Sequence, residues 1–223
     1  MARLVLVPSP FVGANAWGAT AEALTDAMVV DYGGVSAPDW YEGAAARIAA
    51  QADGRPWIAV LHSGAGGFAP AIASAASDLV GLIFLDAVLP YPGRSCLQNA
   101  PAELADQLRR LTTNGRLAPW NQWFGADPTP CLIPDPRARA AFVQDLPSVP
   151  FAFLEAVSPA SAEWEGLPAA YVQLSRGYDG AALTAEARGW MVRRARLHHL
   201  AMVSDPGQVA DLLGDLPLIG SET

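Results

Sequence analysis

Short hydrophobic runs alternate with segments of helical periodicity along the first part of the chain. The runs are continuously apolar and end at polar or turn-forming residues, which is typical of strands buried on both faces. This pattern predicts strands at 4–7, 29–31, 57–61 and 82–85, and helices at 17–28, 42–52 and from the glycines at 64–67 to about residue 76. Strands and helices that alternate in this way indicate an α/β fold, with a mostly parallel sheet flanked by crossover helices.

The alternation breaks in the middle of the chain, at approximately residues 91–168. This stretch holds most of the prolines and contains no convincing strand. Helices are predicted only at 102–111 and, shorter, near 137–142. We therefore expect a single domain over residues 1–223, with a helical cap at approximately 91–168 inserted over the end of the sheet.

Beyond this insertion the alternation of strands and helices resumes. It predicts strands at 169–174 and 192–197, and helices at 181–188 and 206–213. Ser204 or Asp205 is expected to cap the last helix, because serine and aspartate side chains accept hydrogen bonds from the free backbone N–H groups there. Pro206 suits the first helical position.

Composition limits the possible partners. Hydrophobic residues make up 52% of the chain, but no run approaches the roughly 20 apolar residues of a membrane-spanning helix. The start of the chain is too short for a signal peptide and is predicted to be the first strand, so we expect a cytoplasmic protein without a membrane partner. A net charge of −8 without a basic block argues against nucleic-acid binding.

The residue types also restrict the chemistry. Cys96, Cys131 and the three histidines do not have the spacing of metal ligands, so no metal site is expected. All basic side chains are arginine, so no lysine is present to form a Schiff base.

Ser63 is the candidate nucleophile. It follows the apolar strand at 57–61 and precedes Gly64, Ala65, Gly66 and Gly67. A sharp turn from strand to helix needs small residues and exposes the side chain at its tip. The Gly64 N–H, at the start of the helix, is a candidate donor to an oxyanion.

His199 is the candidate base. It lies after the last predicted strand and before the last helix, and one of the two adjacent histidines can face a pocket. We favour His199 over His198 because an apolar segment follows it directly. His62 is expected to pack beneath Ser63.

Two carboxylates are candidates for the acid that would orient His199. Asp86 stands directly at the end of the strand at 82–85, whereas Asp179 lies a few residues beyond the strand at 169–174. Either loop can reach the histidine, and its task is to hold the imidazole tautomer and stabilise its positive charge. We favour Asp86, with Asp179 as the alternative.

At these residues the sequence resembles the α/β-hydrolase superfamily, especially its small esterase and hydroxynitrile-lyase-like members. The resemblance rests on LVLVPSPFVGANAW at 4–17, VLHSGAGG at 60–67, FLDAVLPYPGRS at 84–95 and HLAMVSDPGQVA at 199–210. It implies an α/β-hydrolase fold, a triad of Ser63, His199 and an acid, no cofactor, and a small-molecule substrate. The cap is left unmatched.

Two departures from the family pattern bear on activity. Leu61 and Ala65 occupy the outer glycine positions of the usual Gly-x-Ser-x-Gly turn. In the first loop, Pro8, Ser9 and Pro10 stand where the family has His-Gly followed by a residue that donates its N–H to the oxyanion. Proline has no N–H, so the Phe11 N–H or the Ser9 hydroxyl would have to replace it.

Three functions are compatible with these residues. The first is an esterase- or thioesterase-like serine hydrolase for an apolar small molecule, with a pocket drawn from the aromatic residues Trp120, Trp123, Phe124, Phe151 and Phe153. The second is a lyase, dehydratase or cyclase of a biosynthetic pathway that uses Ser63 and His199 as acid and base. The third is a non-catalytic ligand-binding protein, which would separate Ser63 from both histidines.

Overall fold

The computed structural model, which describes residues 2–220, is built on a six-stranded sheet in the order β2-β1-β3-β4-β8-β9, and every neighbouring pair is parallel. The strands are β1 (Arg3–Val7), β2 (Ala27–Val29), β3 (Trp57–His62), β4 (Leu79–Leu85), β8 (Ala169–Gln173) and β9 (Met191–Arg194). The predicted α/β fold with a parallel sheet is confirmed.

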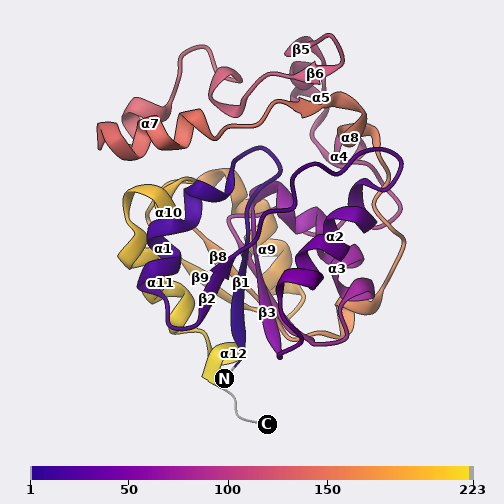
Figure 1. Ribbon diagram of the computed structural model, residues 1–223, viewed down its shortest axis with the longest axis vertical. Helices are drawn as coiled ribbons and strands as arrows, with labels where there is room; N and C mark the ends of the chain where they lie inside the picture. Colours follow the sequence, from indigo (N-terminus) through magenta and orange to yellow (C-terminus); the bar gives the residue numbers. More distant parts are fainter. Residues whose placement is uncertain (1, 221–223) are drawn as a thin grey trace.

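Helices cover both faces of the sheet (Figure 1). On one face lie α1 (Gly18–Ala23), α10 (Ala201–Ser204) and α11 (Pro206–Gly214), and on the other α2 (Trp40–Gln51), α3 (Ala69–Ala75) and α9 (Asp179–Ala187). A short helix, α12 (Pro217–Gly220), ends the described chain. Helices on both faces explain the continuously apolar runs of β1 and β3, because successive residues of these strands have a helical layer to pack against on either side.

Alternate residues of the strands divide between two hydrophobic cores. Leu4 and Leu6 of β1 pack on the α1 and α11 side, whereas Val5 and Val7 pack on the α2 and α3 side. Successive side chains of a strand point to opposite faces, so one run of apolar residues supplies both cores.

The segment at 91–168 lies largely over the carboxyl ends of the strands, while α12 lies at the opposite end (Figure 1). It contains α4 (Cys96–Asn99), α5 (Ala102–Arg110), η3 (Trp120–Gln122), α6 (Thr129–Leu132), α7 (Pro136–Gln144), α8 (Phe151–Glu155) and η4 (Glu163–Gly166). The expectation that it has no strand is wrong. A small antiparallel sheet joins β5 (Thr112–Thr113), β6 (Arg116–Leu117) and β7 (Val149–Pro150). Strands of two residues are too short to show periodicity in the sequence.

Helix α11, which the sequence predicts as the last helix, begins as expected at Pro206, but without the expected side-chain cap, and α12 follows it. Asp205 occupies the N-cap position and makes no capping hydrogen bond. Instead, the Ser204 hydroxyl donates to the Asp205 carboxylate at 2.6 Å, which engages both candidate capping side chains with each other.

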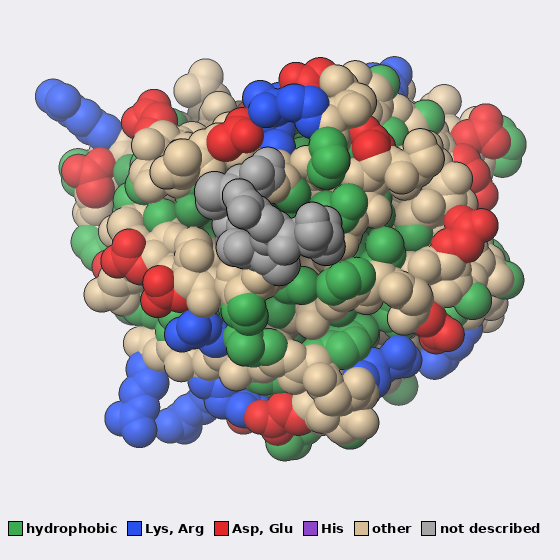
Figure 2. Space-filling view, turned by 90° about the horizontal axis from the view of Figure 1, so that it is seen from below, with side chains coloured by type: hydrophobic (Ala, Val, Ile, Leu, Met, Phe, Trp, Pro, Cys, Tyr) green, Lys and Arg blue, Asp and Glu red, His purple; other side chains and the backbone are tan. Residues whose placement is uncertain are grey.

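Figure 2 shows the face at the bottom of Figure 1. Acidic and arginine side chains lie around the edge of this face, with hydrophobic side chains between them. Within residues 2–220 there is no helix long and apolar enough to cross a bilayer.

Candidate active site

Ser63 sits at a sharp turn where β3 passes into η2 (Ser63–Phe68), and its φ angle is +55°. Non-glycine residues rarely adopt this left-handed conformation, so the surrounding structure must hold it in place. A Cβ atom on Gly66 would lie 1.8 Å from the Val88 carbonyl oxygen, and one on Gly67 would lie 2.4 Å from the Tyr91 hydroxyl. The turn therefore requires glycine at both positions.

The bulky Leu61 does not disturb this turn. Its side chain is fully buried in the core that also contains Ala65. The structure thus accommodates Leu61 and Ala65 in the outer positions of the turn while Ser63 remains at its tip.

Ser63, His199 and Asp86 form a continuous chain of hydrogen bonds. His199 Nε2 lies 3.0 Å from Ser63 Oγ, and His199 Nδ1 lies 2.8 Å from Asp86 Oδ2. All three side chains stand at the carboxyl end of the sheet, after β3, β4 and β9. A parallel sheet with crossover helices gathers these loops at one edge, although they are distant in the sequence.

Asp86 is fully buried and accepts several hydrogen bonds besides that of His199. Its Oδ1 accepts from the backbone N–H groups of Leu174 and Ser175, each at 2.9 Å, and its Oδ2 accepts from the Ser175 hydroxyl at 2.6 Å. Burial by itself opposes ionisation, but the hydrogen bonds from His199 and Ser175 outweigh it and lower the pKa of Asp86. The carboxylate is therefore charged beside the imidazole.

Asp179, the alternative acid, lies elsewhere. It begins α9, and its Oδ1 accepts a hydrogen bond from the Gln173 amide. It lines a different surface depression, together with Arg194. The geometry thus distinguishes two carboxylates that the sequence left open.

Two rings flank the His199 imidazole. The Tyr178 ring stacks on it with centroids 5.1 Å apart and planes at 11°, and the His62 ring lies 4.6 Å away at 32°. The Tyr178 hydroxyl is 3.2 Å from Ser63 Oγ. Burial raises the pKa of Tyr178 to about 12, so this phenol stays protonated at neutral pH. Sequence reasoning missed Tyr178, because only the folded loop brings it to Ser63.

His62 was expected to pack beneath Ser63; it is buried, and it lies beside His199. Its Nε2 is 3.1 Å from the His199 carbonyl oxygen, and its ring meets the edge of Trp17 at 5.9 Å. Burial, and to a smaller extent repulsion from His199, lowers the pKa of His62 well below its ordinary value. His62 is thus a neutral side chain that supports the loop carrying His199. His198 lies outside this cluster, with its Nε2 2.9 Å from the Ser204 hydroxyl.

A cavity of about 450 Å³, here called the Ser63 cavity, opens over this cluster. Five of the residues expected to contact substrate line it: Gly64, Phe11, Trp120, Trp123 and Phe124. Its remaining wall is mostly apolar and includes Val88, Tyr91, Cys96, Leu104, Leu108, Pro128 and Leu132. Many of these residues belong to the inserted segment, so that segment shapes the space in front of Ser63.

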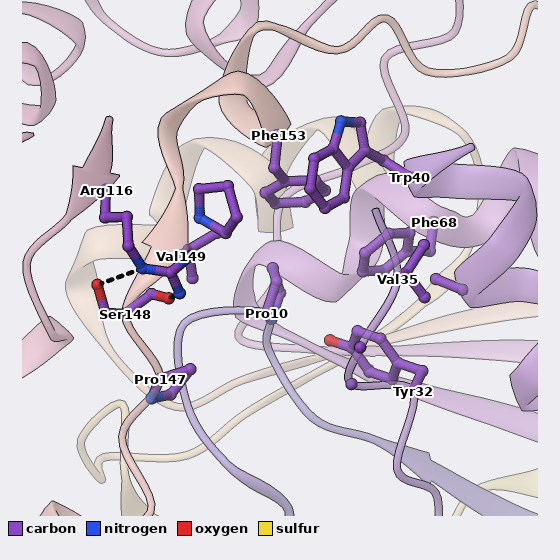
Figure 3. A pocket seen from close by; sticks show the side chains of 14 residues that line it. Pro10, Tyr32, Val35, Trp40, Phe68, Arg116, Pro147, Ser148, Val149 and Phe153 are labelled. Atoms are coloured by element: carbon purple, nitrogen blue, oxygen red, sulfur yellow. Dashed lines mark hydrogen bonds between the residues drawn. The ribbon is translucent and has the colours of Figure 1, made fainter. Parts of the chain in front are cut away.

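Ser9 and Pro10 do not line the Ser63 cavity, contrary to expectation. Pro10 points into a second cavity of about 360 Å³, which Trp40, Phe68 and Phe153 enclose and Arg116 borders (Figure 3). Ser9 faces a third hollow on the same side. The loop at 8–11 separates these spaces from Ser63.

Phe151 and Phe153 are also absent from the wall of the Ser63 cavity. Phe153 stacks on Phe68 at 6.0 Å and lines the second cavity, while Phe151 packs against the cluster formed by Leu97, Leu108 and Leu154. Phe153 thus joins the inserted segment to the rest of the domain, whereas Phe151 packs within the inserted segment.

The loop at 8–11 packs directly against the turn at Ser63. A Cβ atom on Gly64 would lie 2.9 Å from the Phe11 ring and 3.2 Å from the Pro10 ring. The Phe11 N–H, expected as a substitute oxyanion donor, instead donates to Ser9 Oγ at 3.3 Å. This loop therefore offers neither a Pro10 N–H nor an uncommitted Phe11 N–H.

Across residues 2–220, the structure contains no group of three or more His, Cys, Asp or Glu side chains placed to hold a metal ion. Cys96 is partly buried against the Ser63 cavity, and burial raises the pKa of its thiol to about 11, so it is not a thiolate at neutral pH.

Comparison with solved structures identifies the fold. No protein-family profile and no curated protein sequence matches the chain. Solved structures do. An extracellular α/β-hydrolase from a Paenibacillus species, described as sharing homology with tobacco salicylic acid binding protein 2, is 19% identical with a TM-score of 0.74, covering 96% of this chain and 98% of its own. A pyrethroid hydrolase from Sphingobium faniae is 16% identical, with a TM-score of 0.64 and 96% of each chain covered. AqDC, which cleaves the ring of the Pseudomonas quinolone signal, is 16% identical, with a TM-score of 0.63 over 99% of this chain and 93% of its own. These similarities extend over nearly the whole sheet and its loops, and the chain therefore has the α/β-hydrolase fold.

Proposed function

We propose that the protein is a serine hydrolase that cleaves an ester or thioester of an apolar small molecule. The observation that carries this proposal is the unbroken hydrogen-bond chain from Asp86 through His199 to Ser63 Oγ. Such a chain lets the imidazole take the serine proton, while the carboxylate holds the tautomer and stabilises the charge that forms.

In the proposed reaction, Ser63 Oγ attacks the carbonyl carbon and its proton passes to His199 Nε2. The electron pair of the carbonyl bond moves onto oxygen, where the N–H of Gly64 can donate to it. When the intermediate collapses, the leaving alkoxide or thiolate takes the proton from His199. Water, activated by His199, then releases the acid and restores Ser63.

The apolar wall of the Ser63 cavity favours binding of an apolar substrate. Trp120, Trp123 and Phe124 face Ser63 across a space of about 450 Å³, which is the size of a small-ligand pocket. Two of the similar structures are described as hydrolases, one of them for pyrethroids. These descriptions support the reaction class, and the substrate of this chain is inferred from its own cavity.

Labelling with a fluorophosphonate tests the proposal. Wild-type protein is expected to gain the mass of a single adduct and to hydrolyse p-nitrophenyl butyrate, and Ser63→Ala is expected to do neither. Ser74→Ala is the matched control, since the Ser74 hydroxyl donates to the Pro70 carbonyl at 3.1 Å and Ser74 does not line the Ser63 cavity. An unlabelled but folded wild-type protein would contradict the proposal.

A second candidate function has a specific observation in its favour. The loop at 8–11 offers Ser63 neither a Pro10 N–H nor a free Phe11 N–H, because proline has none and the Phe11 N–H donates to Ser9. Loss of one oxyanion donor costs about 10²–10³ in rate, which would disfavour ester hydrolysis. A lyase, dehydratase or cyclase that uses Ser63 and His199 only for proton transfer does not need that donor.

The two functions differ in whether a covalent intermediate forms. Rapid quenching of wild-type protein with a slow ester, followed by mass measurement, should trap an acyl group on Ser63 if the protein is a hydrolase. Product release without any acyl adduct at all quench times would favour the proton-transfer function.

A further inference from the structure

The hydrogen-bond network around Ser63 determines which group donates and which accepts in each contact. The buried Asp86 carboxylate can only accept, so His199 Nδ1 carries the hydrogen that joins them. His199 Nε2 is then without a hydrogen and accepts from the Ser63 hydroxyl. Since the Ser63 hydrogen is used, the Tyr178 hydroxyl must donate in its 3.2 Å contact with Ser63 Oγ.

Stacking on His199 fixes the Tyr178 ring with its hydroxyl next to Ser63 Oγ. The ring stacks nearly parallel on the His199 imidazole, and the Tyr178 side chain lines the Ser63 cavity. Its hydroxyl therefore lies beside Ser63 Oγ, in the wall of the cavity where a substrate carbonyl must stand. A donor fixed before the reaction stabilises developing charge without a cost of reorganisation.

The rest of the site lacks the donor that Tyr178 can supply. Pro10 has no N–H and points into the second cavity, and the Phe11 N–H donates to Ser9 Oγ. We propose that the Tyr178 hydroxyl is a catalytic hydrogen-bond donor, which stabilises the negative oxygen of the tetrahedral intermediate formed at Ser63. This inference rests on the proposed hydrolase function.

The hydrogen bond from Tyr178 passes from Ser63 Oγ to the substrate oxygen as Ser63 reacts. In the resting site, Ser63 Oγ accepts the hydrogen bond from Tyr178. As Oγ bonds to the carbonyl carbon it gives up electron density, while the former carbonyl oxygen gains a negative charge on the same carbon atom. The Tyr178 hydroxyl then donates to that oxygen, which is the stronger acceptor. Tyr178 keeps its proton in this step, in which the only proton that moves is that of Ser63, to His199.

Tyr178→Phe tests this role, because it keeps the stacked ring and removes the hydroxyl. We expect kcat for p-nitrophenyl butyrate to fall by about 10²–10³, with KM changed less than threefold. An aryl boronic acid, which forms a tetrahedral adduct with an active serine, should lose affinity by a similar factor. Tyr32→Phe is the control, since Tyr32 does not line the Ser63 cavity and its hydroxyl donates to the Pro8 carbonyl at 2.6 Å, and it should leave both values unchanged.

A second variant covers the case in which Tyr178→Phe does not fold. Replacement of Tyr178 by 3,5-difluorotyrosine keeps the shape but makes the phenol more acidic, so the alkaline limb of the kcat profile should move to lower pH. A merely structural tyrosine would not move that limb.

The outcomes separate this proposal from the function on which it rests. If wild-type protein hydrolyses the ester and Tyr178→Phe keeps kcat within threefold, the donor role is overturned and the hydrolase function stands. Loss of kcat with unchanged boronic acid affinity also overturns the donor role. If wild-type protein forms no serine adduct and cleaves no ester, both proposals are overturned.

Discussion

The Asp86 carboxylate and the His199 imidazole are joined by a 2.8 Å hydrogen bond, although 113 residues separate them in the chain. Replacement of Asp86 by asparagine should reverse the hydrogen-bond polarity at Nδ1 and favour the wrong imidazole tautomer. We expect ester kcat to fall by about 10³–10⁴, as measured by steady-state kinetics. Asp179→Asn is the control and should remain within threefold of wild type, because Asp179 bonds Gln173 instead. Equal losses in the two variants would contradict the assignment of Asp86.

Buried His62 should make stability depend on pH. Its pKa lies well below the usual 6.5 in the folded protein, so below pH 6.5 only the unfolded chain binds a proton at this residue. No stability is lost above pH 6.5, and as the pH falls below it the loss is about 1.4 kcal/mol per pH unit until the lowered pKa is reached.

Urea unfolding of wild type and His62→Gln between pH 5 and pH 8 measures this effect. Glutamine does not titrate and can still donate to the His199 carbonyl. The free energy of unfolding of wild type should therefore fall relative to that of the variant as the pH drops below 6.5. A difference that stays constant across this range would show that His62 is protonated in the folded protein.

Gly66 should tolerate no side chain. A Cβ atom there would lie 1.8 Å from the Val88 carbonyl oxygen, and the backbone that carries this oxygen is fixed by a 3.0 Å hydrogen bond from Val88 N–H to the Ser63 carbonyl. We expect Gly66→Ala to lower the free energy of unfolding by about 3 kcal/mol, measured by chemical denaturation. Gly180→Ala meets nothing within 4 Å and serves as the control. An unaffected Gly66→Ala would mean that the turn at Ser63 can open.

Phe124 should influence binding of long substrates without affecting the chemistry. It is 47% exposed, packs edge-on against Trp120 at 5.0 Å and forms part of the wall of the Ser63 cavity. Phe124→Ser should raise KM for p-nitrophenyl octanoate by about three- to tenfold, because apolar contact area is lost, and should leave kcat unchanged. Leu183→Ser, at a position on α9 that is 60% exposed, should change neither value. A lower kcat in Phe124→Ser would place this residue nearer the reacting atoms.

The sequence predicts those parts of the molecule that depend on local patterns. The strand before Ser63 and the glycines after it specify the turn, because an apolar run and small residues are visible without knowledge of the fold. The positions of β1, β3, β4 and β8 follow from the same apolar runs.

The remaining parts depend on tertiary contacts. Asp86 and Asp179 both follow strands, and only the distances to His199 separate them. Tyr178 carries no local signal, since its role arises from stacking on a histidine that lies after another strand. Ser9 and Pro10 were expected at the Ser63 cavity, because sequence position alone does not reveal which side of a loop faces the nucleophile.

The hydrogen bonds of Asp86 have a consequence for the architecture of the chain. The same carboxylate that holds His199 also accepts from the backbone of Leu174 and Ser175, so it fastens the end of β4 to the end of β8. Residues 91–168 leave and rejoin the domain between these two strands. This segment can therefore vary in length and shape. The hydrogen bonds between Asp86 and the backbone of Leu174 and Ser175 hold the two strand ends together and keep the distances between Ser63, His199 and Asp86 constant.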